Sequence, residues 1–539
     1  MNTTYDYIIV GAGSAGCVLA DQLSQCGRYS VLVLEAGGKD SSPWIKMPIG
    51  YGRLFYDERV NWKYETEADP GTNNRRAYWP RGKVVGGSSS INALVYCRGL
   101  PHDFDDWQAA GATGWGWSDV KPHFEAIEMR INQQGQEHGS GRQAVSDVGA
   151  HIHRANRHFF TAAEQAGLPY TADFNGAEPE GVGHYAITTR KGLRCSAADA
   201  FLKPALKRAN VTLHTHAHVQ RIRFDDDRAQ GVIYQHQGQR IEVTANCEVI
   251  ISAGAVDSPR ILQLSGIGPD ALLQQHGITP LLVNESVGAH LQDHIAVSYY
   301  YRATEPTLNN QLSPWYGKLK AGLTYALTRR GPLGLSVNQC GGFVRSHEAA
   351  QHADMQLYFN PVTYTTSPSN KRPIINPDPF AGFIISFQPS RPTSRGQVSI
   401  RSRSIHDAPV IEPRYLSTQK DVDDILLGGR LLRSIINTPG LQRLIKAPMD
   451  VDLNQLDDDA MIEDFRQRSG TVYHPVSSCR MSTSAASGVV DSRLRVHGIR
   501  GLRVVDASVF PNLTSGNTNA PTLMLAHKAA GLILEDHRR

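Results

Sequence analysis

The start of the chain carries an apolar pattern that predicts a strand, a tight turn, a helix and a second strand. Residues 5–10 are β-branched and aromatic, as in a buried strand. A glycine-rich turn follows, and the apolar residues after it recur with helical spacing through about Gln25. The run SVLVLEAG then predicts a strand that ends near Glu35. This order is typical of a βαβ unit in an α/β protein.

Strand patterns also fill the middle of the chain. The segment LHTHAHVQRIRFDDDRAQGVIYQ alternates as strands joined by a turn do, and EVIISAGA predicts the end of a further strand. Ser258 followed by Pro259 predicts the start of a helix that closes at residues 265–268. Between residues 350 and 400, MQLYFNPV, AGFIISFQPS and GQVSIRS predict strands. Near the carboxyl end, PTLMLAHKAAGLILED predicts a helix.

Length and composition indicate a globular protein of several domains. The 539 residues are enough for two or three domains of about 100–200 residues each. With 40% hydrophobic and 20% charged residues, the chain is neither disordered nor collagen-like. The net charge of +4 is small for this length and gives no reason to expect a nucleic acid or a strongly anionic membrane as partner.

The cysteines and the amino-terminal segment bear on the compartment. Seven cysteines are scattered without a CxxC pair, which favours reduced thiols over a disulfide scaffold or a zinc site. The first residues, MNTTYDYIIVGAG, lack the features of a signal peptide, and no apolar run reaches about 18 residues. We therefore expect a cytoplasmic protein without a transmembrane segment. Peripheral contact with the inner membrane is compatible with this expectation.

The first glycine-rich turn has the spacing of a phosphate cradle. Gly11 permits a tight turn, Gly13 lets the backbone approach a pyrophosphate, and Gly16 lets helix and strand pack closely. The helix that follows offers free N–H groups and a positive dipole to the phosphates. Glu35 lies 24 residues after Gly11, where a carboxylate can accept both hydroxyls of an adenosine ribose. A dinucleotide is therefore predicted, and this motif leaves NAD and FAD open.

A second stretch of small residues, GKVVGGSSSIN at 82–92, could lie against a flat ring or a phosphate. It could equally be a loop into a helix in which Ser88 to Ser90 act as caps. The residues alone do not decide between these readings.

Several long motifs together resemble those of the glucose–methanol–choline (GMC) oxidoreductase family. Residues 82–105 and 254–268 match its two signatures, and VGAHLQDH, TSRGQV, VYHPVSSCRM and LRVVDASVFPNLTSGNTNAPT follow in the family's order. The chain looks most like the choline and aliphatic-alcohol dehydrogenase branch. The resemblance implies FAD as cofactor. It also implies an α/β fold: a doubly wound, Rossmann-like FAD-binding domain and a substrate domain with an antiparallel sheet.

The resemblance divides the chain between these two domains. The FAD-binding domain would take residues 1–150, 191–300 and 481–539. The substrate domain would take residues 151–190 and 301–480.

The resemblance assigns a catalytic pair. The family has a histidine facing the flavin N5 edge in a VYHP context, which His474 matches. Six residues after the proline of DASVFP the family has His or Asn, and counting from Pro511 gives Asn517. A neutral imidazole can take the hydroxyl proton of an alcohol, and an amide can donate to the developing alkoxide. The hydride would go to flavin N5.

The resemblance also places FAD contacts along the chain. Val219 would contact adenine through its backbone, Asp506 would lie near the ribityl–pyrophosphate link, and the run from Asn519 would border the pyrimidine edge of the flavin. Ile91 occupies the position of the histidine that some members join to the flavin, so we expect non-covalent FAD. The full set is Gly11, Gly13, Ser14, Ala15, Gly16, Glu35, Ala36, Arg81, Val85, Gly86, Ser90, Asn92, Ala93, Val95, Val219, Ala253, Tyr473, Asp506, Ala507, Asn519, Pro521 and Thr522.

The substrate and the electron acceptor stay open at this point. A primary alcohol, aliphatic or aryl, is favoured over choline and over a sugar or polyol. The acceptor would be a quinone or another carrier in a dehydrogenase, or O2 in an oxidase that releases H2O2. Candidate pocket residues are aromatic or carry amides: Tyr358, Phe359, Tyr364, Phe383, Phe387, Asn338, Gln356 and Gln388. Serines at 477, 478 and 482 replace residues that the family often has as Gly-Thr and Gly.

Three rival interpretations make different predictions. A NAD-dependent dehydrogenase would share the first motif and have no use for the others. A lyase acting on cyanohydrins would bind FAD without reducing it. A binding module would leave His474 and Asn517 idle.

Overall fold

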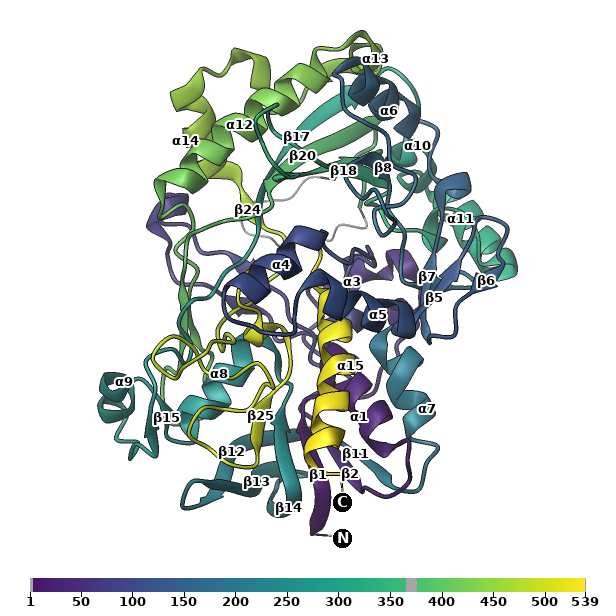
Figure 1. Cartoon of the computed structure of the whole chain (residues 1–539). Coiled ribbons are helices and arrows are strands. Elements are labelled where there is room, and N and C mark those ends of the chain that lie inside the picture. Colours follow the sequence, from purple (N-terminus) through teal and green to yellow (C-terminus); the bar gives the residue numbers. More distant parts are fainter. Residues whose placement is uncertain (1–2, 365–375, 539) are drawn as a thin grey trace.

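The computed structural model describes residues 3–364 and 376–538. Within them, two seven-stranded sheets form the two halves of an elongated molecule (Figure 1). The lower half in this view contains both termini, and the upper half contains the sheet formed mainly by residues from the middle of the chain.

The lower sheet has the strand order β11-β2-β1-β14-β13-β12, and β25 pairs with the last residues of β14, Val249–Ile251. Strands β11, β2, β1, β14 and β25 run parallel, whereas β12, β13 and β14 pair antiparallel. The strands are β1 (Thr4–Val10), β2 (Val31–Glu35), β11 (Val211–Thr215), β12 (Ala217–Asp225), β13 (Arg228–His236), β14 (Gln239–Ile251) and β25 (Leu502–Val504).

Helices explain why the central strands are apolar throughout. All five residues of β2 are buried, as are the last four of β1, because parallel strands have both faces covered. Helix α1 (Ser14–Ser24) packs against α15 (Asn519–Asp536), which packs in turn against α5 (Trp117–Ile127). The long yellow α15 in Figure 1 is thus the centre of the helical layer.

The upper sheet has the order β23-β17-β20-β19-β18-β8, with β24 also paired to β17. All its pairings are antiparallel. Its strands are β8 (Gly181–His184), β17 (Ile295–Ala303), β18 (Cys340–Val344), β19 (Met355–Asn360), β20 (Gly382–Pro389), β23 (Ile445–Pro448) and β24 (Gly470–Thr471). An apolar core joins this sheet to α6 (Asn156–Gln165), α12 (Gln419–Ile436), α13 (Pro439–Gln442) and α14 (Asp458–Arg468).

The remaining helices and strands surround the two sheets. The helices are α2 (Pro43–Lys46), α3 (Tyr51–Leu54), α4 (Pro101–Ala109), α7 (Lys203–Ala205), α8 (Gly254–Leu264), α9 (Asp270–Gln275), α10 (Leu308–Leu312) and α11 (Trp315–Thr328). The short strands are β3 (Tyr64–Glu65), β4 (Tyr78–Trp79), β5 (Glu128–Ile131), β6 (Glu137–His138), β7 (Gln143–Ser146), β9 (Thr189–Arg190), β10 (Leu193–Arg194), β15 (Ile267–Gly268), β16 (Leu282–Val283), β21 (Gln397–Ser399) and β22 (Val410–Glu412).

The predicted fold class is confirmed: a doubly wound, Rossmann-like sheet stands beside an antiparallel sheet. The predicted strand at 5–10, the predicted strand that ends near Glu35, the predicted strands within 213–235 and the carboxyl-terminal helix are also present. The proposed division into two domains at 150, 190, 300 and 480 stays a prediction, and β17 begins at Ile295, just before one of these boundaries.

The start of one helix was predicted wrongly. Ser258 and Pro259 do not open α8, which begins four residues earlier at Gly254. A proline inside a helix leaves the carbonyl four residues before it without its partner. Here that carbonyl belongs to Ala255, and the Ser478 hydroxyl donates to it at 2.6 Å. A side chain 223 residues away therefore lets the helix extend through the proline.

Within the described ranges, no helix has both the length and the apolar content that a membrane crossing requires.

Replacing Ser478 should destabilise the fold through this carbonyl. In Ser478→Ala the buried Ala255 carbonyl loses its donor, and we expect the free energy of unfolding to fall by about 1–3 kcal/mol. Denaturant unfolding measures the change. Ser434→Ala, on the exposed side of α12, is the matched control and should change stability by less than about 0.5 kcal/mol. An equal effect of the two substitutions would contradict this account of α8.

Candidate active site

A cavity of about 1110 Å³ is lined by residues of both sheets. Loops at the carboxyl ends of the lower strands supply Gly11, Glu35 and Ala253, and strands of the upper sheet supply Ser298 and Tyr358. In an open α/β sheet, ligands bind outside the carboxyl ends of the strands. The cavity therefore lies where such a sheet is expected to bind its ligand, and the antiparallel sheet covers it.

The three glycines of the first motif have different structural roles. A Cβ at Gly11 would lie 2.4 Å from the carbonyl oxygen of Ser252, and one at Gly16 would lie 1.9 Å from the carbonyl oxygen of Gly11. These two glycines are required by the protein's own packing. A Cβ at Gly13 would meet only the Ser252 oxygen, at 3.9 Å. Gly13 thus leaves space on the cavity side of α1, whose first N–H groups no side chain caps.

Glu35 is held at the end of β2 by two backbone donors. Its Oε2 accepts from the N–H of Ala12 at 3.0 Å, and its Oε1 accepts from the N–H of Gly37 at 2.8 Å. Burial raises the pKa of Glu35 to about 7. Each carboxyl oxygen keeps a further lone pair, so the group can accept a sugar hydroxyl in the cavity.

The second glycine-rich stretch packs directly on the first. The N–H of Gly86 donates to the carbonyl of Ala12 at 2.7 Å, and a Cβ at Gly87 would lie 2.7 Å from the Cα of Gly13. Arg81, just before this stretch, donates from Nη2 to the carbonyl of Tyr473 at 2.7 Å. Two loops whose contacting residues are 74 positions apart in the sequence therefore lie together beneath the cavity.

Asp506 ties the segment 254–268 to the carboxyl-terminal segment. Its Oδ2 accepts from the N–H of Gly254 at 2.8 Å and from the Ser258 hydroxyl at 2.5 Å. Its Oδ1 accepts from the N–H of Ser508 at 2.8 Å. Ser258 thus anchors the first turns of α8 to the loop after β25. It was predicted to open the helix, and it lies inside the helix instead.

The cavity brings together most of the residues predicted to contact a cofactor. Those that line it are Gly11, Gly13, Ser14, Ala15, Glu35, Ala36, Arg81, Asn92, Ala93, Val95, Val219, Ala253, Tyr473, Asp506, Ala507, Asn519 and Thr522, together with His474 and Asn517. Five predicted residues do not line it: Gly16, Val85, Gly86, Ser90 and Pro521. Three of them shape the second loop from behind, since Ser90 donates to the Val85 carbonyl and a Cβ at Gly86 would meet the Ser90 hydroxyl.

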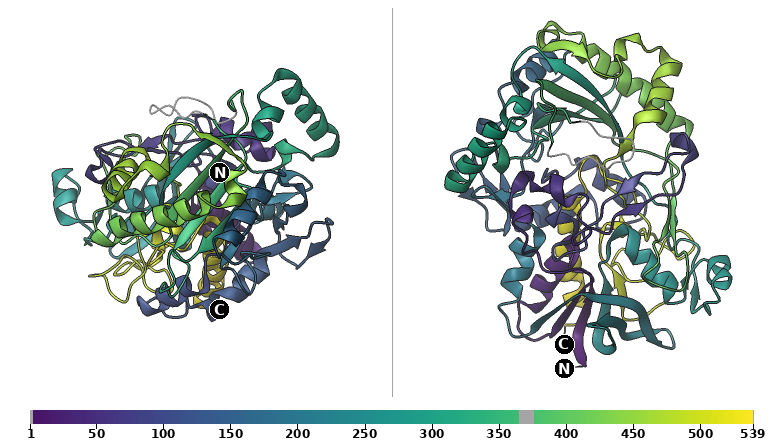
Figure 2. Two further views of the ribbon diagram at one scale, coloured as in Figure 1. Left: turned by 90° about the horizontal axis from the view of Figure 1, so that it is seen from above. Right: turned by 180° about the vertical axis from the view of Figure 1, so that it is seen from behind.

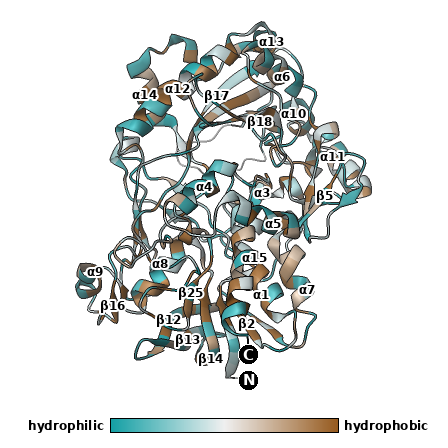
Figure 3. Ribbon diagram, in the orientation of Figure 1, coloured by the Kyte–Doolittle hydropathy of each residue, from teal (hydrophilic) through white to brown (hydrophobic). Residues whose placement is uncertain are grey.

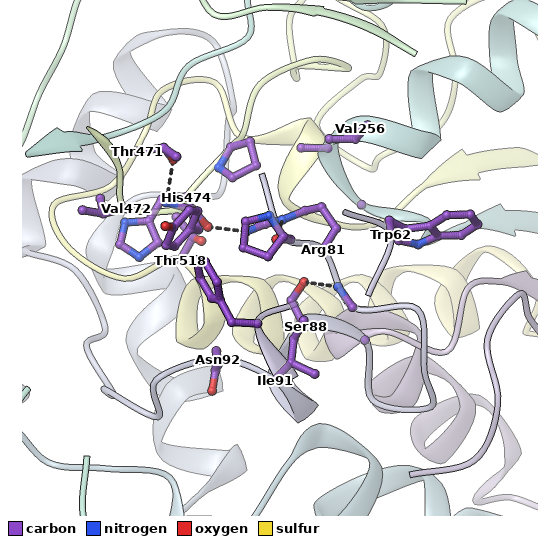
Figure 4. Close-up of a pocket in the computed structure, with 18 of the residues that line it drawn as sticks. Trp62, Arg81, Ser88, Ile91, Asn92, Val256, Thr471, Val472, His474 and Thr518 are labelled. Atoms are coloured by element: carbon purple, nitrogen blue, oxygen red, sulfur yellow. Dashed lines mark hydrogen bonds between the residues drawn. The ribbon is translucent and has the colours of Figure 1, made fainter. Parts of the chain in front are cut away.

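His474 and Asn517 are in direct contact. The Nδ2 of Asn517 lies 3.0 Å from the Nε2 of His474. On the other side of the ring, the Nδ1 of His474 lies 3.0 Å from the Nδ1 of His294. In Figure 4, Thr471, Val472 and Thr518 lie beside His474, and Trp62 lies at the opposite end of the pocket.

The hydrogen bonds fix which nitrogen of His474 carries the proton. The Nε2 of His294 faces the carbonyl oxygen of Ser390 at 2.9 Å, so it must be protonated. A neutral His294 then has a lone pair on Nδ1, and this nitrogen accepts from the Nδ1–H of His474. The Nε2 of His474 is left with its lone pair, and the Asn517 amide donates to it.

The surroundings keep His474 neutral. Burial, with His294 and Arg81 nearby, lowers the pKa of His474 well below the ordinary value of 6.5. Burial likewise lowers the pKa of His294 to about 4. Asp293, next in the chain to His294, accepts from the backbone N–H of His474 at 2.7 Å and from the hydroxyls of Thr471 and Tyr415. This carboxyl positions the backbone of His474 and does not contact its ring nitrogens.

Asp293 and His294 were not predicted as site residues. They end the motif VGAHLQDH, which indicates family resemblance and no particular role. Nothing local in that motif indicates that its histidine meets a histidine 180 residues away.

The far wall of the cavity is aromatic and amide-rich. Tyr358, Tyr364 and Asn338 line it, as three of the predicted pocket residues. Phe359, Phe383 and Phe387 lie instead in the core between the upper sheet and its helices. Gln356 and Gln388 are buried and bonded to each other, and neither lines the cavity.

Among the described residues that line the cavity, four are acidic, and three of these are already engaged. Glu35 and Asp506 accept backbone N–H groups, as above, and Asp257 binds Tyr64 and Arg260. Asp450 is exposed. Every buried carboxylate of the described lining is therefore already hydrogen-bonded, and Asp257 is also paired with the cationic Arg260.

The residues fit a dinucleotide with a flat ring. Two buried polar atoms of the lining, the Oγ of Ser252 and the Oδ1 of Asn517, have no partner among the described residues. Such atoms are costly unless a bound group satisfies them. The free N–H groups of α1, the open space at Gly13 and the acceptor at Glu35 supply what a pyrophosphate and an adenosine ribose require.

Comparisons with known proteins agree with this fit. The family model described as GMC oxidoreductase matches residues 5–296 with its amino-terminal part and residues 392–526 with its carboxyl-terminal part. The "Alcohol dehydrogenase [acceptor]" of Pseudomonas putida is 39% identical over 98% of this chain and 96% of its own. The "Oxygen-dependent choline dehydrogenase" of Vibrio vulnificus is 39% identical over 99% and 95%. The crystal structure of pyridoxine 4-oxidase from Mesorbium loti has a TM-score of 0.87 at 30% identity, covering 99% and 100%.

A substitution at Gly13 should prevent cofactor loading and leave folding intact. We expect Gly13→Val to fold and to lose the predicted FAD, because its side chain would fill space that the protein leaves open for a phosphate. The visible flavin absorbance of the purified protein measures loading, and circular dichroism measures folding. Gly16→Ala is the contrast, since it clashes within the protein and should impair folding itself. A yellow Gly13→Val protein would refute the assignment.

Proposed function

Since the chain belongs to the GMC oxidoreductase family, whose members depend on FAD, we propose that it oxidises a primary alcohol to an aldehyde. The enzyme is thus an oxidoreductase, with His474 proposed as its general base and Asn517 as its partner. The observation that carries the proposal is the unprotonated Nε2 of a buried, neutral His474 beside an amide donor at the cavity.

FAD, when bound, supplies a hydride acceptor at flavin N5. The chain would hold it non-covalently, because Ile91, whose side chain forms no such bond, occupies the position used for the covalent link in some family members. The phosphates would lie over Gly13 and the start of α1, and the ribose hydroxyls would reach Glu35.

Residues of the chain itself would accept the hydroxyl proton of the alcohol. His474 receives the hydroxyl proton of the alcohol on Nε2, which becomes possible when the substrate displaces the Asn517 amide from that lone pair. The amide has two N–H groups and can then donate to the oxygen on which negative charge develops. Asp293 and His294 keep the imidazole in place from behind.

The lining of the cavity favours an uncharged substrate. A quaternary ammonium such as choline is recognised by aromatic faces together with a negative charge. The aromatic faces are present, while the acidic residues of the described lining are engaged or exposed. An aliphatic or aryl primary alcohol is therefore proposed, with choline as the alternative that the Vibrio relative suggests.

We propose a dehydrogenase that passes its electrons to a quinone or another carrier. The similarity to a protein named "Alcohol dehydrogenase [acceptor]" supports this. The alternative is an oxidase that uses O2 and releases H2O2.

An anaerobic titration tests the function directly. Purified yellow protein is mixed without air with benzyl alcohol, hexanol, hydroxymethylfurfural, choline or glucose, and the flavin absorbance is followed. Bleaching by an uncharged primary alcohol, with slow recovery when air is admitted, is expected. Rapid recovery would identify an oxidase. Bleaching by choline alone would reverse the substrate assignment, and no bleaching by any alcohol would favour the lyase interpretation.

Loss of the base should slow flavin reduction without removing the cofactor. We expect His474→Ala to keep FAD and to reduce the flavin about 10²-fold more slowly or worse, because no other group takes the hydroxyl proton. Anaerobic stopped-flow mixing with a substrate identified by the titration measures the rate. His527→Ala is the matched control: this histidine of α15 pairs with His123 and should leave the rate within about twofold. Near-normal reduction in His474→Ala would reject the assignment.

His294 should act as a positioning residue through the tautomer of His474. In His294→Ala the Nδ1–H of His474 loses its acceptor, the Nε2–H form becomes accessible, and we expect reduction to slow about tenfold or more. His294→Asn offers an amide oxygen near the same place and should recover much of the rate. A merely structural role predicts no such recovery.

The pH profile distinguishes a tautomer effect from a shifted pKa. Because the pKa of His474 is lowered, its base form is present at pH 6.5 and above and is lost only as the pH falls well below that value. In His294→Ala, the rate plateau above pH 6.5 should fall, and the profile should also move toward higher pH, because His294 helps to lower the pKa of His474. A profile displaced along the pH axis with an unchanged plateau would contradict the tautomer account.

A further inference from the structure

Helix α11 presents its large apolar side chains to the outside of the molecule. A surface helix normally turns its apolar stripe inward. Here the large apolar side chains are more than half exposed: Trp315 by 75%, Tyr316 by 64%, Leu319 by 55%, Leu323 by 55% and Leu327 by 83%. They account for half of the large apolar side chains that are exposed in the described chain.

These side chains form one continuous stripe. At 3.6 residues per turn, they fall within an arc of about 120° on the helix. Lys318 and Lys320 flank the arc on its two sides. The stripe therefore has the layout of an amphipathic helix whose apolar face is free.

The opposite face of α11 anchors it to the protein. Ala321 and Tyr325 are its buried residues, and the Tyr325 hydroxyl donates to the carbonyl of Gly192 at 2.9 Å. Ala321 belongs to an apolar cluster with Tyr51, Leu335 and other residues. The helix is thus packed through small and aromatic residues, and its exposed stripe is a fixed feature of the surface.

The charged residues of the segment that contains the stripe are of one sign. Lys318, Lys320, Arg329 and Arg330 are exposed, and none forms an ion pair with a described residue. The sequence from 306 to 347 contains no aspartate or glutamate. The weak net charge of the whole chain thus conceals a local basic surface.

The helix also lies where a flat surface could reach it. It forms the outer edge of the molecule beside the boundary between the two halves, and it projects outward when the molecule is seen from above (Figure 2). In the hydropathy colouring, hydrophobic residues are visible on this outer edge (Figure 3).

We propose that the exposed face of α11 docks the enzyme on an anionic lipid membrane, with the helix lying in the plane of the interface. Leucines and a tryptophan that enter the boundary between headgroups and acyl chains, beside lysines and arginines that meet anionic headgroups, are the features of such helices. A second copy of the chain fits less well. Two such faces would bring basic residues together without an acidic partner, and like charges repel.

Vesicle co-sedimentation of the full FAD-loaded protein tests the proposal. Vesicles of phosphatidylcholine with about a third phosphatidylglycerol carry the anionic surface, and pure phosphatidylcholine vesicles are the neutral comparison. We expect the protein to bind the anionic vesicles and the triple variant Leu319→Ser, Leu323→Ser, Leu327→Ser to bind at least about 10²-fold more weakly. Lys318→Gln with Lys320→Gln should weaken binding to anionic vesicles by about tenfold or more.

A matched control uses exposed apolar residues elsewhere. Leu281 and Val283 are 41% and 50% exposed, and Leu281→Ser with Val283→Ser should leave vesicle binding unchanged. All variants should bleach with alcohol as the unaltered protein does, so the assay is independent of the proposed reaction. The proposal is overturned if the unaltered protein does not bind anionic vesicles, or if the triple variant binds as well. A dimer in sedimentation that the triple variant abolishes, without vesicle binding, would instead assign the face to a second copy.

Discussion

The hydrogen-bond chain from the Ser390 carbonyl through His294 to His474 is the contact on which the proposed chemistry depends. Its members are brought together by the upper sheet: Ser390 follows β20, His294 precedes β17, and His474 follows β24, which pairs with the start of β17. The ends of β20 and β17 and the pairing of β24 with β17 thus place these groups so that the proton of His474 lies on Nδ1. A single carbonyl oxygen, which can only accept, determines the direction of every donor that follows it.

The sequence predicted those parts of the site whose residues are close together in the chain. The glycines of the first motif, Glu35 and the strands around them follow from spacing and from the requirements of a phosphate. His474 and Asn517 were assigned through family resemblance, and their direct contact agrees with that pairing. His294 was missed because its meaning comes from a partner 180 residues away. The same cause explains the error at α8, where the Ser478 hydroxyl satisfies a carbonyl that Pro259 would leave free.

The exposed stripe of α11 shows the same limit for surfaces. Apolar residues at helical spacing predict an amphipathic helix, and the usual inference places that face in the core. Only the structure shows that Ala321 and Tyr325 pack against the protein, so that the large apolar face of this helix is exposed to solvent. Sequence periodicity identifies the existence of an apolar face, but it does not identify what covers that face.

The cavity and α11 are connected through shared residues, and this connection bears on the substrate. Tyr51, Leu94 and Val337 line the cavity and also belong to the apolar cluster that contains Ala321. A membrane that met α11 would therefore lie beside one wall of the cavity. Apolar alcohols partition into a bilayer and charged ones do not, because burying a charge in an apolar medium is costly. Within the described lining, the buried carboxylates are already hydrogen-bonded, so the pocket and the docking face favour the same uncharged class of alcohol.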